Sequence, residues 1–336
     1  MQDGIPEYEL VLHMCTSISV PVNLLAIFCI ATQSSNTMKK YKWYLLNVQI
    51  WIFLTDLILF ILIAPRFYFP LIAGTMHGLF FHIGVPYEVQ TIIGFGTGVG
   101  MLSACTQAIQ YRHCQIVPPS SVLARSSKTK TFVNCIRYLL FCQISIPAVI
   151  TEPVNQMEAK LRVSEKYPFH PDFFFDPRVY LLQETPFFVF VPGSLVISYV
   201  FIELSFYIVQ SFRQLNKRVS HMSERTKRLQ KKYFICICVQ VIRIHKQKFQ
   251  LFWSKHFQVL VPCIFCIIPI GFLCFAIVSG YHVQFWNDMA VIVFGLHGTF
   301  ATLVMLPLYQ PYRKFCKTLL CCNFRPFQKI HSLAVT

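Results

Sequence analysis

Seven apolar stretches, separated by polar segments, run along the chain. A helix needs about 20 mostly apolar residues to cross a hydrocarbon core of roughly 30 Å. Because lipid offers no hydrogen-bond partner to an open backbone, each stretch is predicted to be a helix. The expected spans are residues 10–32, 44–64, 89–110, 132–151, 186–210, 256–279 and 289–309. The pattern therefore predicts an all-α membrane protein with a seven-transmembrane helix bundle.

The composition agrees with this class. Hydrophobic residues make up 55% of the 336 residues and charged residues 13%, about half the usual quarter of a soluble domain. Seven spans and their loops leave no room for a separate soluble domain. We expect a short extracellular segment at residues 1–9, a membrane domain at residues 10–309 and a cytoplasmic tail at residues 310–336.

Lysine and arginine collect on alternate sides of the predicted spans. The first, third and fifth loops and the tail are basic, and Glu224 is the one acid among them. The segment before the first span instead carries Asp3, Glu7 and Glu9 and no base. The positive-inside rule places the basic loops in the cytosol, the amino terminus outside and the carboxyl terminus inside. The net charge of +16 is then explained by the cytosolic loops and the lipid surface, and no nucleic-acid partner is expected.

Ionisable residues inside predicted spans are costly and need a reason. Asp56 lies midway along the second span, and the open readings are a cation site, a polar switch between helices, a ligand contact or interhelical packing. His297 lies in the seventh span beside Gly295 and Gly298, where small residues allow a neighbouring helix to approach. We interpret Asp56 and His297 as intramembrane switch or packing positions. Glu203, in the fifth span, is expected to meet bases of the fifth loop.

No motif in the sequence supports catalysis. Paired carboxylates, HExxH, a nucleophile elbow and a nucleotide fingerprint are all missing. The run GFGTGVG at residues 94–100 lies within a span, so its glycines predict close helix packing and not a phosphate loop. We therefore expect no enzymatic activity, cofactor or metal, and the sequence leaves the ligand-binding residues unknown.

The chain has 14 cysteines, none of them in the amino-terminal segment or the three predicted outer loops. Three follow the last span, next to basic residues: Cys316, Cys321 and Cys322. Juxtamembrane cysteines of this kind are candidates for palmitoylation, and unmodified thiols are the alternative.

Several segments resemble the nematode serpentine chemoreceptors, most closely class H, with class I as the neighbouring competitor. They are TMKKYKWYLLNVQIW (37–51), FPLIAGTMHGLF (69–80), MSERTKRLQKKY (222–233) and LHGTFATLVMLPLYQPYRKF (296–315). The resemblance implies a GPCR-like chemosensory receptor in the ciliary membrane of sensory neurons. It would bind an extracellular small molecule and activate a heterotrimeric G protein. The alternatives are a ligand-gated channel or transporter, and a non-signalling product of a decaying receptor gene.

Under this reading, the basic residues at the cytosolic mouth are expected to face the G protein. Arg112 occupies the place of the arginine that ends the third span in better-known receptors, although no acid precedes it. The full set is Arg112, Arg225, Lys227, Arg228, Lys231, Lys232, Tyr312 and Arg313.

The sixth span departs from the family pattern. Apolar residues begin at Tyr233, but Arg243, Lys246, Lys248 and Lys255 interrupt them. Each base at mid-membrane costs about 2.5–3.5 kcal/mol, so the four would cost roughly 10 kcal/mol. Either the span begins near residue 256, after a long cytosolic segment, or residues 242–258 are a translated intron.

Overall fold

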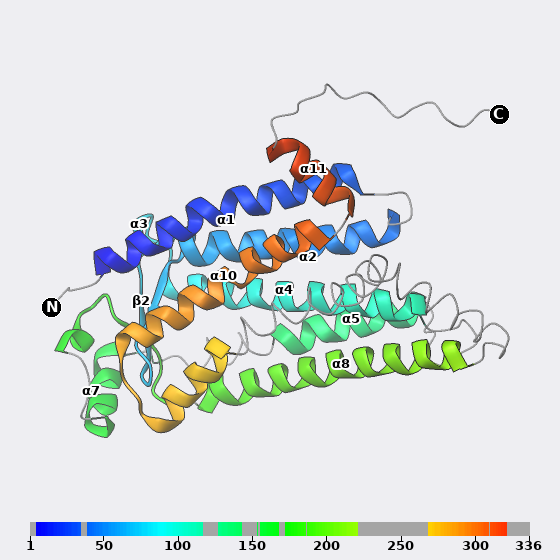
Figure 1. Cartoon of the computed structure of the whole chain (residues 1–336). Coiled ribbons are helices and arrows are strands. Elements are labelled where there is room, and N and C mark those ends of the chain that lie inside the picture. The colour runs from blue at the N-terminus through cyan, green and yellow to red at the C-terminus, as the bar shows by residue number, and fades with distance from the viewer. Residues whose placement is uncertain are drawn as a thin grey trace, which may run out of the picture.

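A computed structural model describes residues 5–34, 39–116, 127–142, 153, 155–167, 172–185, 187–220, 268–308 and 310–320. Long helices run side by side in alternating directions (Figure 1). They are α1 (Ile5–Gln33), α2 (Lys39–Leu57, continued by a π-helical turn at Ile58–Leu62), α4 (Tyr87–Ile116), α5 (Ser127–Cys142), α8 (Phe187–Ser220) and α10 (Gln284–Leu308). A shorter apolar helix, Ile268–Ser279, precedes α10.

The helices confirm the predicted fold class. In the described part of the chain, five helices are long and apolar enough to cross a membrane. They are α1, α2 with its π-helical turn, α4, α8 and α10, which correspond to predicted spans one, two, three, five and seven. The fourth predicted span begins in α5 and the sixth ends in the helix Ile268–Ser279. The remaining parts of these two spans lie outside the described residues.

Glycines let the helices pack closely around α2. A Cβ atom at Gly298 of α10 would lie 2.4 Å from Ile52, and one at Gly295 would lie 2.4 Å from the Phe60 ring. A Cβ atom at Gly100 of α4 would lie 2.4 Å from the ring of Trp51. Both α10 and α4 therefore approach α2 at positions where a side chain would not fit, as the small residues of spans three and seven predict.

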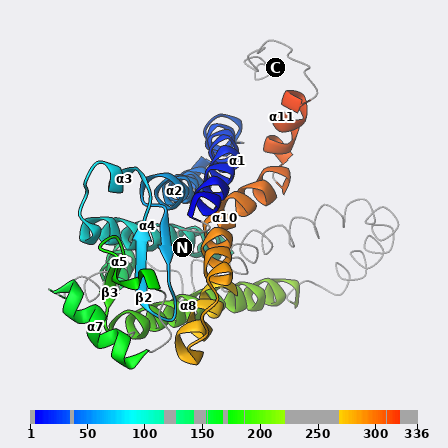
Figure 2. The ribbon, with the colours of Figure 1, turned by 90° about the vertical axis from the view of Figure 1, so that its left-hand side faces the viewer.

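A small antiparallel sheet at one end of the bundle was not predicted. Its strands, in the order β1, β2, β3, are Pro65–Phe67, Ile72–Met76 and Tyr180–Gln183. They join the second and fourth predicted loops, and Figure 2 views the bundle from this end. The helix α7 (Gln156–Lys166) and a 3-10 turn at Asp172–Phe175 complete the unit, which we name the cap. The short helix α3 (Leu79–His82) follows β2.

The cap has its own apolar core, made of Tyr68, Leu71, Ala73, Ala159, Val163, Phe174, Val179 and Leu181. Most positions of its three strands are buried, and α7 contributes one buried face. The amino terminus lies at this cap end of the bundle (Figure 1).

The opposite end, which we name the tail end, also carries an unexpected element. After α10 the chain forms the helix α11 (Gln310–Leu320). Its residues Tyr312, Phe315 and Cys316 pack against a cluster contributed by α1, α2 and α10, and the Phe28 and Phe315 rings lie 5.6 Å apart. The first part of the predicted tail is thus a helix anchored on the bundle.

Candidate functional site

Asp56 lies at the centre of a buried polar network that joins three helices. Its side chain on α2 is 2% exposed. Its Oδ2 atom accepts hydrogen bonds from Asn23 Nδ2 at 2.7 Å, from Thr299 Oγ1 at 3.2 Å and from the Ser19 hydroxyl. No partner for the Oδ1 atom is found among the described residues. The carboxyl group therefore links α1 and α10 to α2, because neutral donors from both helices share one of its oxygens.

A second layer of hydrogen bonds extends this network. Gln49 Nε2 donates to Asn23 Oδ1 at 2.8 Å and to Thr302 Oγ1 at 2.9 Å. The Asp56 network comprises Ser19, Asn23, Gln49, Asp56, Thr299 and Thr302. Sequence reasoning missed its neutral members. The available signal was their spacing, since Ser19 and Asn23 lie one helical turn apart within a span, as do Thr299 and Thr302.

His297 belongs to a different contact. It is 2% exposed, and its Nε2 atom lies 2.8 Å from the sulfur of Met101 on α4. Its Nδ1 atom contacts the Phe294 carbonyl oxygen. Within the described residues no hydrogen bond joins His297 to Asp56. The histidine thus links α10 to α4, and Asp56 links α10 to α1 and α2.

An intramembrane ion pair joins α5 to α8. Arg137 is fully buried, and its Nε atom donates to Glu203 Oε2 at 3.2 Å, while Nη2 donates to the other carboxylate oxygen. Glu203 thus meets a base of α5, whereas most bases of the fifth loop, which it was expected to meet, lie outside the described residues. The signal was present in the sequence, since Arg137 falls inside the predicted fourth span.

Three of the predicted G-protein-facing residues, Arg112, Tyr312 and Arg313, lie in the described part of the chain. The Arg112 guanidinium lies over the ring of Tyr41, 4.0 Å from its centroid, at the tail end of α4. Arg313 is partly exposed on α11. Arg225, Lys227, Arg228, Lys231 and Lys232 lie outside the described residues.

Tyr312 lies within the packed tail end of the bundle. Its side chain is fully buried, and its hydroxyl lies 2.9 Å from the Ser34 hydroxyl at the end of α1. Tyr312 packs with Ile30 and Met305 because α11 turns its apolar face towards α1 and α10. It therefore anchors α11, and its role towards the G protein stays a prediction.

Cys316 lies on the same inward face of α11. It packs against the cluster that holds Cys29. Palmitoylation of Cys316 stays a prediction, and Cys321 and Cys322 lie outside the described residues.

The cap is fastened to α10 by charged and polar side chains. Arg66 of β1 donates to both oxygens of Asp288, with Nη2 2.8 Å from Oδ2. Gln284 Nε2 donates to the Phe67 carbonyl oxygen at 3.0 Å, and Asn287 Nδ2 donates to the Phe69 carbonyl oxygen at 3.0 Å. The first turn of α10 therefore holds the first strand of the cap in place.

Ionisable groups of the cap reflect their surroundings. Hydrogen bonds from Arg178 lower the pKa of Asp176 to about 2. Burial lowers the pKa of Lys160, whose Nζ donates to the Asp176 carbonyl oxygen at 2.8 Å. Burial also lowers the pKa of His77, against the opposing effect of Glu9 at 3.2 Å.

The aromatic residues of the fourth predicted loop support the cap itself. Phe174 and Tyr180 are buried in the cap, and Tyr167, Phe173 and Phe175 pack partly buried against the cap core. The ring of Tyr180 also stacks on Tyr87 of α4 at 4.9 Å, which ties the cap to a second helix.

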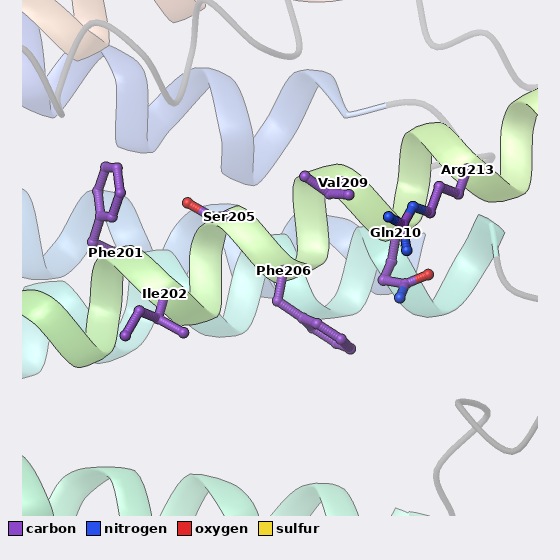
Figure 3. A pocket seen from close by; sticks show the side chains of 7 residues that line it. All are labelled: Phe201, Ile202, Ser205, Phe206, Val209, Gln210 and Arg213. Carbon is purple, nitrogen blue, oxygen red and sulfur yellow. The ribbon is translucent and has the colours of Figure 1, made fainter.

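A hollow of about 360 Å³ lies along α8, lined by Phe201, Ile202, Ser205, Phe206, Val209, Gln210 and Arg213. All seven side chains come from this one helix (Figure 3). The hollow occupies the half of α8 nearer the tail end, away from the cap. Its position therefore does not match a ligand site beneath the predicted outer loops.

The bundle of helices long and apolar enough to cross a membrane is that of a multi-pass membrane protein. Residues 6–245 and 243–322 match the family described as serpentine type 7TM GPCR chemoreceptor Srh, so the chain belongs to this family of chemoreceptors. It is also 21% identical over 310 residues to serpentine receptor class H-72 of Caenorhabditis elegans, covering 90% of this chain and 82% of that protein. The two matched segments meet at residues 243–245, where the predicted sixth span is interrupted.

Proposed function

We propose that this receptor binds an extracellular small molecule at its cap end and activates a cytosolic heterotrimeric G protein at its tail end. The amino terminus would then lie outside the plasma membrane and the basic loops inside. Membership of a chemoreceptor family supports this reading, and the likeness to class H receptors favours the ciliary membrane of sensory neurons. Residues 10–309 would form the receptor domain, with residues 1–9 outside and residues 310–336 inside.

The observation that carries the proposal is the path of α10. Its first turn binds the cap through Asp288 and Asn287. Its middle donates Thr299 and Thr302 to the Asp56 network. Its last turns, with Met305, pack in the cluster that seats α11. One rigid helix thus contacts the proposed ligand end, the buried polar network and the proposed G-protein end.

Ligand binding would shift an existing equilibrium between two arrangements of this helix. A ligand that contacts the cap differently in the two arrangements changes their populations, and α10 carries the change to the tail end. Asp56 and His297 are suited to such a change because they join α10 to different neighbours. In this role they are positioning residues within the bundle and do not touch the ligand.

The test is the contribution of Arg112 to signalling. We expect Arg112→Ala to keep its surface level and to lose most of the G-protein nucleotide exchange that the wild-type receptor stimulates without added ligand. Because removal of one partner from a charge-dependent contact costs roughly 2 kcal/mol or more, the loss should be about tenfold or greater. Exchange is measured on G protein co-reconstituted with receptor and normalised to the amount of receptor.

Arg162→Ala provides the matched control. Arg162 is also an arginine in contact with another side chain, but it lies in the cap and is exposed. It should leave nucleotide exchange unchanged. Equal exchange by wild-type receptor and Arg112→Ala at equal receptor levels would reject the role of Arg112.

A further inference from the structure

The ion pair between Arg137 and Glu203 is unusual for its position. Arg137 is fully buried and the Glu203 side chain is 10% exposed. Glu203 lies in a helix long and apolar enough to cross a membrane, and Arg137 lies within the predicted fourth span. Replacing a buried ion pair with apolar residues often costs little stability, so such a pair is weak evidence of a purely structural role. Ionisable residues at membrane depth mark functional positions by default.

The pair lies within a set of contacts that joins three helices. Tyr207 Oη donates to Glu203 Oε1 at 3.0 Å, and Arg137 Nη1 donates to Asn134 Oδ1 at 2.8 Å. The Tyr207 ring lies 5.2 Å from the ring of His113, which is on α4 next to Arg112. His113 Nδ1 lies 3.2 Å from Ser211 Oγ, further along α8. These contacts connect α5, α8 and the tail end of α4.

We propose that the Arg137–Glu203 pair is a conformational lock, which holds the tail-end half of α8 against α5 and α4 in the resting receptor. Opening of the pair accompanies G-protein activation, and to this extent the inference rests on the proposed function. Inside the bilayer no bulk water competes for the two charges, so their attraction is strong. The receptor with the ion pair formed and the receptor with the two charges apart are therefore two distinct states. The chain continues from α8 into the basic fifth loop, so movement of α8 displaces the bases of that loop.

The hollow-lining part of α8 is consistent with this role. Phe201, Ile202 and Phe206 line the hollow and are 62%, 68% and 44% exposed in the described structure, whereas Tyr207 is buried beside His113. Towards α4, the same helix packs through Val196 and Val200 against Val99, nearer the cap end. The ion pair and the Tyr207–His113 contact therefore hold the half of α8 that these valines do not reach.

The decisive variant is the apolar pair Arg137→Leu with Glu203→Met. It removes both charges together, so neither is left buried without its partner, and the protein is expected to fold. We expect the ligand-independent nucleotide exchange per receptor to rise about fivefold or more, the lower range of typical allosteric coupling. The single variant Glu203→Gln leaves a buried arginine without its anion and should reduce the surface level.

A second measurement does not depend on the G protein. Hydrogen exchange followed by mass spectrometry on purified receptor should show faster exchange in α8 around Tyr207 for the apolar pair. Ser205→Ala, a change on the hollow-lining face of the same helix, is the matched control and should match the wild-type receptor in both measurements.

If the folded apolar pair has the hydrogen exchange and the nucleotide exchange activity of the wild-type receptor, the lock is overturned. If no form of the receptor activates a G protein, the proposed function fails, but faster hydrogen exchange in α8 of the apolar pair would still show that the ion pair restrains this helix. Unchanged hydrogen exchange in that case would reject both the proposed function and the lock.

Discussion

The two ends of the bundle differ in how their basic residues are paired. At the cap end, bases are matched to acids: Arg66 pairs with Asp288, Arg162 with Glu184 and Arg178 with Asp176. At the tail end, the loops and the tail contain one acid, Glu224, among many bases. There, Arg112 lies on an aromatic ring and Lys42 Nζ donates to the Ala31 carbonyl oxygen at 2.6 Å.

The difference shows what each end is built to contact. All three arginines of the cap pair with acids, one of them on α10, and the cap has its own apolar core, so it is suited to facing water. The tail end carries positive charge without acids in its own loops, and anionic lipid headgroups attract each base by about 1 kcal/mol. An acidic surface of a cytosolic partner would gain from the same charge. The contrast therefore supports the cap as the outer end and the tail end as the signalling end.

The largest effect, on the amount of receptor at the cell surface, is expected from deleting the basic segment that interrupts the sixth span. Deleting residues 242–258 should join two apolar runs into one span and remove bases whose insertion would cost roughly 10 kcal/mol. We expect several times more receptor at the cell surface, measured by labelling of intact cells. A surface level equal to or below that of the full-length chain would show that the segment is a genuine cytosolic extension.

Asp56 lies between the two ends of the bundle. Its replacement is expected to have the next largest effect, a loss of stability. Asp56→Leu should destabilise the receptor by about 2–3 kcal/mol, because three buried donors lose their acceptor and each interhelical hydrogen bond is worth about 1 kcal/mol. Asp56→Asn keeps the volume and one acceptor oxygen, so it should cost less. Thermal unfolding of purified receptor provides the comparison. Equal stability of Asp56→Leu and the wild-type receptor would contradict the network.

Breaking the contact between Arg66 of the cap and Asp288 of α10 should cause a smaller loss of stability. Arg66→Ala leaves the Asp288 carboxylate partly buried without its cation, which should cost about 2 kcal/mol. Arg162→Ala removes a similar contact to Glu184 from an exposed position and should cost at most about 1 kcal/mol. If thermal unfolding shows the same loss for both variants, burial does not distinguish the anchor from the exposed pair.

The smallest effect concerns pH. Because burial lowers the pKa of His77 below its usual 6.5, the folded cap favours the neutral ring. His77 costs no stability above pH 6.5, and stability is lost as the pH falls through 6.5 towards the lower folded value. Asp176, with a pKa of about 2, titrates below this range.

Unfolding of His77→Gln should therefore depend less on pH between neutral pH and about pH 5 than unfolding of the wild-type receptor. An identical pH dependence in the two proteins would assign the effect to other groups.

The transmembrane helices could be predicted because lipid imposes a single requirement on every residue of a span. Hydropathy alone located α1, α2, α4, α8 and α10, and the glycines at 100, 295 and 298 correctly indicated close packing. The cap could not be predicted in this way. Its sheet pairs β2 with β3, which are far apart in the sequence, and such pairing leaves no local periodic signal.

The candidate site was predictable only in part. Asp56 and His297 stand out because ionisable groups are rare in spans, but the partners of Asp56 are neutral residues that are common in any helix. Arg137 was overlooked because it lies near the basic side of its span, where bases are expected. The packing of α11 was overlooked although Tyr312, Phe315 and Cys316 have the i, i+3 and i+4 spacing of one apolar helix face, which indicates an amphipathic helix after the last span.

The most direct test of the account is the side of the membrane on which the amino terminus lies. An epitope tag placed before Gln2 should stain on intact cells, and a tag after Thr336 should stain only after permeabilisation. This result would place the cap outside and the basic tail end in the cytosol. An amino-terminal tag that stains only after permeabilisation would contradict both the topology and the proposed receptor function.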